Sequence, residues 1–100
     1  MLEAVDTRSI VFRMLNNLKA IYADTHDWPR TVRTIDLMLM TRPGAIVEYR
    51  DRGMAHLRTG DLRRARADLE HYLLNAIDVP DAASVREQLH LVERLDAMRN

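Results

Sequence analysis

A repeat of 34 residues constrains the fold of this chain more than any other feature of its sequence. Asp27 and Asp61 lie 34 positions apart, and each precedes a large apolar residue, Trp28 or Leu62. A period of this length is typical of stacked supersecondary units that share one continuous core. The same offset relates Leu15 to Tyr49, Lys19 to Gly53, Tyr22 to His56, Thr31 to Ala65 and Ile35 to Leu69.

Helix-capping and helix-breaking residues divide the chain into five segments. Asp27 is a good N-cap, and Pro29 fits the first turn of a helix, where its missing N–H costs nothing. Gly60 suits the left-handed residue that follows a helix, and Asp61 can cap the next one. Apolar residues recur at helical spacing, and no segment reads as a strand. We predict five helices. The first follows Asp6 or Thr7, the second follows Asp27, and the fourth follows Asp61. The third covers about residues 45–58 and the fifth about residues 82–98.

Small and large residues follow one another within the repeats in the pattern of the tetratricopeptide repeat. Gly53 and Ala65 are small, so the paired helices can approach closely. Large residues can fill the gaps between pairs: Tyr22, Trp28, Tyr49 and Tyr72. We therefore predict an all-α fold, a fragment of a right-handed α-solenoid. The alternative is an unrelated helical bundle.

The predicted domain consists of two tetratricopeptide-like helix–turn–helix repeats and a C-terminal capping helix. The first repeat covers about residues 12–45 and the second about residues 46–79. The capping helix covers about residues 81–98 and would give the stack a polar end, as repeat proteins require.

Three segments are more specific than the general repeat pattern: residues 13–22 (RMLNNLKAIY), 50–53 (RDRG) and 65–73 (ARADLEHYL). Together they resemble the C-terminal tetratricopeptide region of the bacterial SirB-type transglutaminase-like family, over about residues 7–95. In that family a transglutaminase-like domain with a Cys/His/Asp-type arrangement precedes this region. The present chain contains no cysteine. The resemblance therefore implies a repeat module without its catalytic domain and carries over no catalytic residue. It also suggests that Asp51 or Arg52 ties neighbouring helices together.

Composition limits the classes of function. Fifteen basic residues balance fifteen acidic ones, which argues against a nucleic-acid partner, because such binding needs a net basic field. No apolar run is long enough to span a membrane, and the first residues lack the pattern of a signal peptide. These features favour a soluble, cytoplasmic domain with no membrane partner.

The histidines raise the question of a metal site. Glu87 and His90 have the i, i+3 spacing found in di-iron carboxylate bundles. Such a site needs two of these pairs and two further glutamates on facing helices, and the second candidate pair, Asp68 and His71, is only a looser echo, so we expect no metal and no cofactor. His56 falls where the repeat places a buried aromatic, and we expect a packed, hydrogen-bonded core histidine with a lowered pKa.

Because the sequence offers no catalytic, metal or nucleic-acid site, a binding role remains. We predict a protein–protein or interdomain interaction module rather than an enzyme. Its partner would be a protein, a peptide or a preceding catalytic domain. The alternative is the regulatory C-terminal part of a transglutaminase-like hydrolase or transferase whose catalytic domain is absent from this chain. The first helix of each pair, with the cap, would line a groove for the partner, although Met54 and Leu57 could instead pack against the cap. The candidate groove residues are Arg13, Asn16, Val47, Arg50, Met54, Leu57, Gln88 and Leu91.

The start of the chain suggests weak self-association. Leu2, Val5, Val11 and Phe12 would form an apolar surface that no preceding repeat covers. We predict a weak, symmetric homodimer through the first helix, with Phe12 as its anchor. The alternative for Phe12 is ordinary packing onto the second helix.

Overall fold

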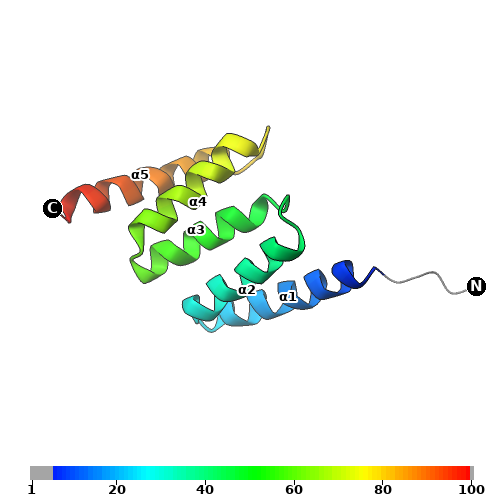
Figure 1. Ribbon diagram of the computed structural model, residues 1–100. Helices are drawn as coiled ribbons and strands as arrows, with labels where there is room; N and C mark the ends of the chain where they lie inside the picture. The colour runs from blue at the N-terminus through cyan, green and yellow to red at the C-terminus, as the bar shows by residue number, and fades with distance from the viewer. Residues whose placement is uncertain (1–5, 100) are drawn as a thin grey trace, which may run out of the picture.

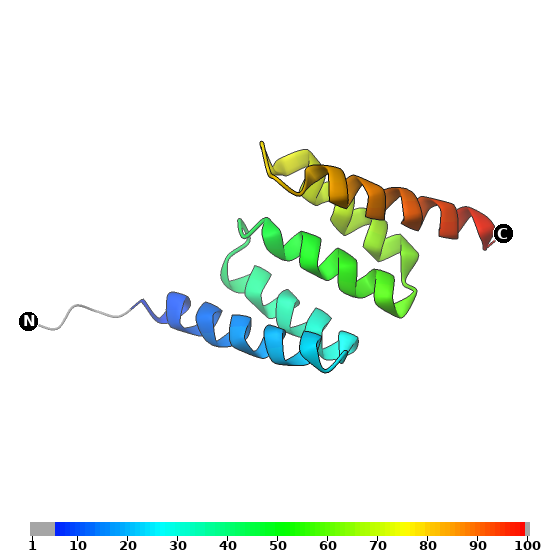
Figure 2. The same cartoon turned by 180° about the vertical axis from the view of Figure 1, so that it is seen from behind.

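The computed structural model describes residues 6–99, which form five helices and no strand. Each helix packs against the next one along the chain, so the five form a stack in sequence order (Figure 1; Figure 2). This arrangement confirms the predicted all-α fold. The expectations for Leu2 and Val5 concern residues outside the described range. The helices are α1 (Thr7–Asp24), α2 (Trp28–Thr41), α3 (Val47–Thr59), α4 (Leu62–Asn75) and α5 (Ala82–Met98).

The predicted caps begin and end the helices. The carboxylates of Asp6, Asp27 and Asp61 accept backbone N–H bonds at the starts of α1, α2 and α4, at 3.0, 3.2 and 3.3 Å. Gly60 ends α3 in the left-handed region, with φ of 80°, which costs glycine little. Helix α3 begins two residues later than predicted, because Ala45 instead forms a turn in which its carbonyl accepts the N–H of Glu48 at 3.0 Å.

Helices α3 and α4 approach closely at Gly53. A Cβ atom at this position would lie 2.9 Å from Cγ and Cδ2 of Leu69, closer than carbon atoms pack without displacement. Ala65, on the facing helix, has no exposed surface. The structure thus confirms that small residues permit the close packing of α3 and α4.

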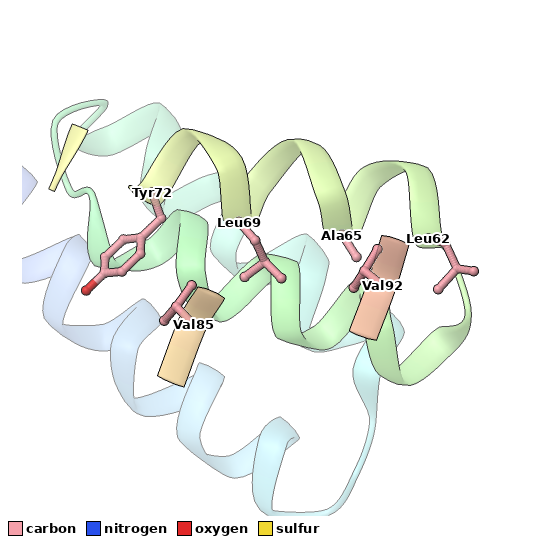
Figure 3. Close-up of a cluster of buried hydrophobic side chains, with 6 residues drawn as sticks. All are labelled: Leu62, Ala65, Leu69, Tyr72, Val85 and Val92. Atoms are coloured by element: carbon pink, nitrogen blue, oxygen red, sulfur yellow. The ribbon is translucent and has the colours of Figure 1, made fainter. Parts of the chain in front are cut away.

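The core lies toward the C-terminal end of the stack. Leu62, Ala65, Leu69 and Tyr72 project from α4, and Val85 and Val92 of α5 complete the cluster (Figure 3). Ile35, Met38 and Leu39 of α2 are also buried, whereas α1 has no buried residue. One whole side of α1 therefore faces solvent.

Candidate partner-binding cleft

A cleft of about 830 Å³ opens between the helices. Its walls come from α1, α3 and α5, together with the first turn of α2. We call this surface the cleft and define it by all the residues that line it. They are Lys19, Ala20, Ala23, Trp28, Thr31, Asp51, Met54, Ala55, Leu57, Arg58, Gln88 and Leu91.

Apolar side chains supply much of the cleft surface. Met54 and Leu57 are half-buried and also pack against the core, and Leu91 of α5 is half-buried on the facing wall. Trp28 adds an aromatic ring, and the guanidinium carbon of Arg58 lies 5.8 Å from its centroid. This cation–π contact places a positive charge at the edge of an apolar surface. The cleft therefore offers a ligand apolar contacts and the cationic group of Arg58, beside a few polar lining side chains such as Gln88.

A network of ion pairs holds the charged wall in place. Lys19 of α1 donates hydrogen bonds of 2.8 Å to Glu48 and to Asp51, both on α3. Its side chain is only 14% exposed. Burial by itself lowers the pKa of Lys19, but the hydrogen bonds to Asp51 and Glu48 outweigh that effect and leave the pKa raised. The ammonium is therefore charged and already paired.

The same network continues to the start of α5. Arg50 donates to Asp51 at 2.9 and 3.0 Å and to Asp81 at 2.7 Å. The hydroxyl of Tyr72, on α4, donates to the other oxygen of Asp81 at 2.6 Å. The hydrogen bond from Tyr72, followed by that from Arg50, lowers the pKa of Asp81, and the same hydrogen bond raises the pKa of Tyr72. The network thus joins α1, α3 and α4 to Asp81, the residue that immediately precedes α5.

Four of the predicted groove residues line the cleft and four do not. Met54, Leu57, Gln88 and Leu91 line it. The other four predicted residues lie outside the cleft. Arg13 and Asn16 are exposed near the middle of α1, Val47 borders a separate hollow beside Arg42, and Arg50 is held by Asp51 and Asp81.

Sequence reasoning also places Ala20 and Ala23 in the groove, and both line the cleft, but it misses several other lining residues. The repeat pattern predicts that Trp28 fills the space between helix pairs, yet the residue also borders the cleft at the start of α2. Lys19 and Asp51 were missed as a pair because they lie 32 residues apart. The one signal in the sequence is that Lys19 is the single lysine in a chain whose other basic residues are arginines.

A second ion-pair cluster lies around Arg52. The guanidinium of Arg52 donates to both oxygens of Asp68, at 2.8 and 2.9 Å, and to Asp36 at 2.8 Å. These bonds join α3 to α4 and to α2. Because Asp51 bonds to Lys19 of α1, both residues that the sequence suggested as ties between helices act in that way.

His56 lies beside this cluster. It is 7% exposed, and burial lowers its pKa although the charge of Asp68 partly opposes this. Its Nε2 is 3.8 Å from Asp68, too far for a hydrogen bond. The expected burial and the expected direction of the pKa therefore agree with the structure, but within residues 6–99 the side chain of His56 forms no hydrogen bond to a protein group, and the carboxylate of Asp68 is bonded to Arg52 instead.

Within residues 6–99, no three histidine, aspartate or glutamate side chains gather as a metal site would require. Glu87 and His90 are both exposed on α5. None of the five helices combines the length and the apolar character that crossing a membrane would need.

Comparisons with known proteins agree with this geometry. A family model described as "Tetratricopeptide repeat" matches residues 18–90. A "UPF0162 protein" of Xylella fastidiosa strain 9a5c is 42% identical over 66 residues, and one of strain Temecula1 is 41% identical over the same length. Each alignment covers 66% of this chain and 24% of the relative, so the chain matches about a quarter of the relatives' length. No solved structure gives a significant match. Since the family model covers most of the helical stack, the chain belongs to the tetratricopeptide repeat family.

Proposed function

We propose that this domain is a protein-interaction module that binds a segment of a partner protein in the cleft. The observation that carries the proposal is the cleft itself, where Trp28, Met54, Leu57 and Leu91 present apolar surface between helices that ion pairs hold in place. A preformed surface of this kind loses little entropy when a ligand binds. No step of this role needs catalysis by the chain.

The charges around the cleft indicate how a partner segment is recognised. Lys19 and Asp51 already bond to each other, so their charges are compensated within the domain. Arg58 is exposed and forms no ion pair within residues 6–99, and Gln88 offers an uncharged polar group. A segment with apolar side chains and an acidic group near Arg58 fits this distribution best.

A second candidate function follows from the length of the relatives. The aligned segment covers only 24% of the UPF0162 proteins, so a related module there is one part of a longer protein. Together with the resemblance to the SirB-type transglutaminase-like family, this supports a regulatory C-terminal module. The segment in the cleft would then come from a catalytic domain outside this chain.

Selection of peptides tests the binding proposal. We expect the full chain, immobilised, to select apolar peptides with an acidic residue from a random displayed library. Leu91→Glu should weaken a selected peptide at least about tenfold, because it places a charge against the apolar wall. Leu74→Glu is the matched control, since Leu74 is 82% exposed on α4 and does not line the cleft. If no peptide is selected, or if Leu91→Glu binds as well as Leu74→Glu, the cleft is not the binding site.

A further inference from the structure

An apolar stripe runs along the solvent side of α1. Ile10, Met14, Leu18 and Ile21 recur at spacings of four, four and three residues, which places them on one face of the helix. They are 38, 61, 41 and 56% exposed. We call these four residues the α1 stripe. None of them lines the cleft, so a role for the stripe does not depend on the proposed function.

The 34-residue repeat indicates which kind of surface the α1 stripe can pack against. The 34-residue offset makes Met14 equivalent to Glu48 and Leu18 equivalent to Arg52. On α3 these positions contact the preceding repeat: Glu48 bonds to α1, and Arg52 bonds to Asp36 of α2. The α1 stripe is therefore a stacking face that fits a helix. It is apolar, whereas the same face of α3 is held by ion pairs.

The other end of the stack does not complement this face. The first turns of α5 carry exposed polar and charged residues, among them Arg86, Glu87, His90 and Glu93. Docking an apolar stripe on such a surface would remove charged groups from water without pairing them, which is unfavourable. Head-to-tail growth of the stack is thus disfavoured. Contact between two α1 stripes buries apolar surface on both sides.

The charges beside the stripe specify the orientation of that contact. Arg13 and Asp24 lie on the same flank of α1, eleven residues apart, and both are exposed. Neither forms an ion pair within residues 6–99. In an antiparallel pair of α1 helices whose two-fold axis lies midway between these two residues, near Leu18 and Lys19, Arg13 of one copy meets Asp24 of the other. In a parallel pair of α1 helices, Arg13 of one copy would not lie near Asp24 of the other.

We propose that the α1 stripe is the interface of a two-fold symmetric homodimer, in which antiparallel α1 helices pack together and Arg13 of each copy pairs with Asp24 of the other. Closed two-fold contacts are the commonest way in which a chain pairs with itself. Phe12 is not the anchor: it is half-buried on another side of α1, where Cζ of Arg42 lies 4.9 Å from its ring centroid. Met14 and Ile21, the most exposed members of the stripe, take that role.

Sedimentation of the full chain tests the interface. Between about 10 µM and about 1 mM, the range in which a weak dimer dissociates, we expect the average mass to rise toward that of two chains. Met14→Glu should raise the dissociation constant at least about tenfold, since it buries a charge in the apolar contact. Met98→Glu is the matched control, because Met98 is 81% exposed at the C-terminal end of α5, the last helix of the stack. A chain that stays monomeric at the highest concentration overturns the proposal, as does a dimer that Met14→Glu and Met98→Glu leave equally strong.

Charge exchange tests the orientation separately. Arg13→Asp alone, or Asp24→Arg alone, should weaken the dimer about three- to tenfold through repulsion, and the double variant should return to within about twofold of the original. Arg94→Asp, at an exposed site on α5, is the control for a change in net charge. A double variant no stronger than the single ones rules out the antiparallel pairing.

The absence of cysteine allows a direct check of proximity. Asn17→Cys places one thiol near the proposed axis, and oxidation should link two copies rapidly. Ala83→Cys on α5 is the control and should cross-link slowly. Equal rates would contradict the proposed interface. Circular dichroism melting of each variant shows that it is folded.

Discussion

Arg52 and Asp68 form an ion pair with two parallel hydrogen bonds, of 2.8 and 2.9 Å, between α3 and α4. Asp68 is 10% exposed in its side chain and Arg52 is 21% exposed. The hydrogen bonds to Asp68 raise the pKa of Arg52 even against burial. Paired planar groups of this kind are stronger than single bonds and fix the relative rotation of two helices.

Arg52→Ala should destabilise the domain by about 3 kcal/mol, because it leaves the carboxylate of Asp68 buried without its partner. Urea unfolding measures the loss. Arg66→Ala is the control: Arg66 and Glu70 form an i, i+4 pair whose side chains are 51 and 44% exposed, and such pairs contribute little. If both variants lose the same free energy of unfolding, the pair of Arg52 and Asp68 contributes no more to stability than an exposed pair does.

Gly53→Leu should cost about 1–3 kcal/mol, since an added side chain meets Leu69 where even a Cβ would lie 2.9 Å away. Leu69 has no exposed surface and little room to move. Thermal unfolding gives the comparison. A Cβ added at Gly44 would meet no atom within 4 Å, so Gly44→Leu should leave the melting temperature nearly unchanged. An unchanged melting temperature for Gly53→Leu would contradict the close approach of α3 and α4.

Local signals in the sequence predicted the helices, whereas side-chain partners on different helices were harder to find. Asp27, Gly60 and Asp61 act within a few residues of themselves, so capping rules sufficed for them. The bond between Lys19 and Asp51 depends on how far α1 and α3 are rotated about their axes, which a residue pattern fixes only coarsely. The same is true of Arg50, which lies on a predicted groove helix but turns toward Asp81.

His56 should make stability depend on pH between about 7 and about 5, a range in which the carboxylates stay ionised. Burial lowers its pKa below the ordinary 6.5, so the unfolded chain binds more protons than the folded one in this range. Stability must therefore fall as the pH drops below 6.5 and level off below the folded pKa. Urea midpoints of His56→Gln should show a smaller pH dependence than those of the original chain. His90→Gln, at an exposed position, should keep the full pH dependence. If the urea midpoints of the original chain and of both variants change equally with pH, His56 is not the source of the pH dependence.

Asp81→Asn should loosen the junction between α4 and α5, because the amide keeps one acceptor for Tyr72 but loses its attraction to Arg50. The pKa of Asp81 is lowered from 3.8, so its carboxylate stabilises the folded state fully above that pH and loses this effect as the pH falls through the folded pKa. The difference in urea midpoint between Asp81→Asn and the original chain should therefore be constant near neutrality and shrink below about pH 3.8. Asp78→Asn, in the same loop but at an exposed site without an ion pair in the described chain, should show no such difference. A difference for Asp81→Asn that does not change with pH would mean that shape, rather than charge, holds this junction.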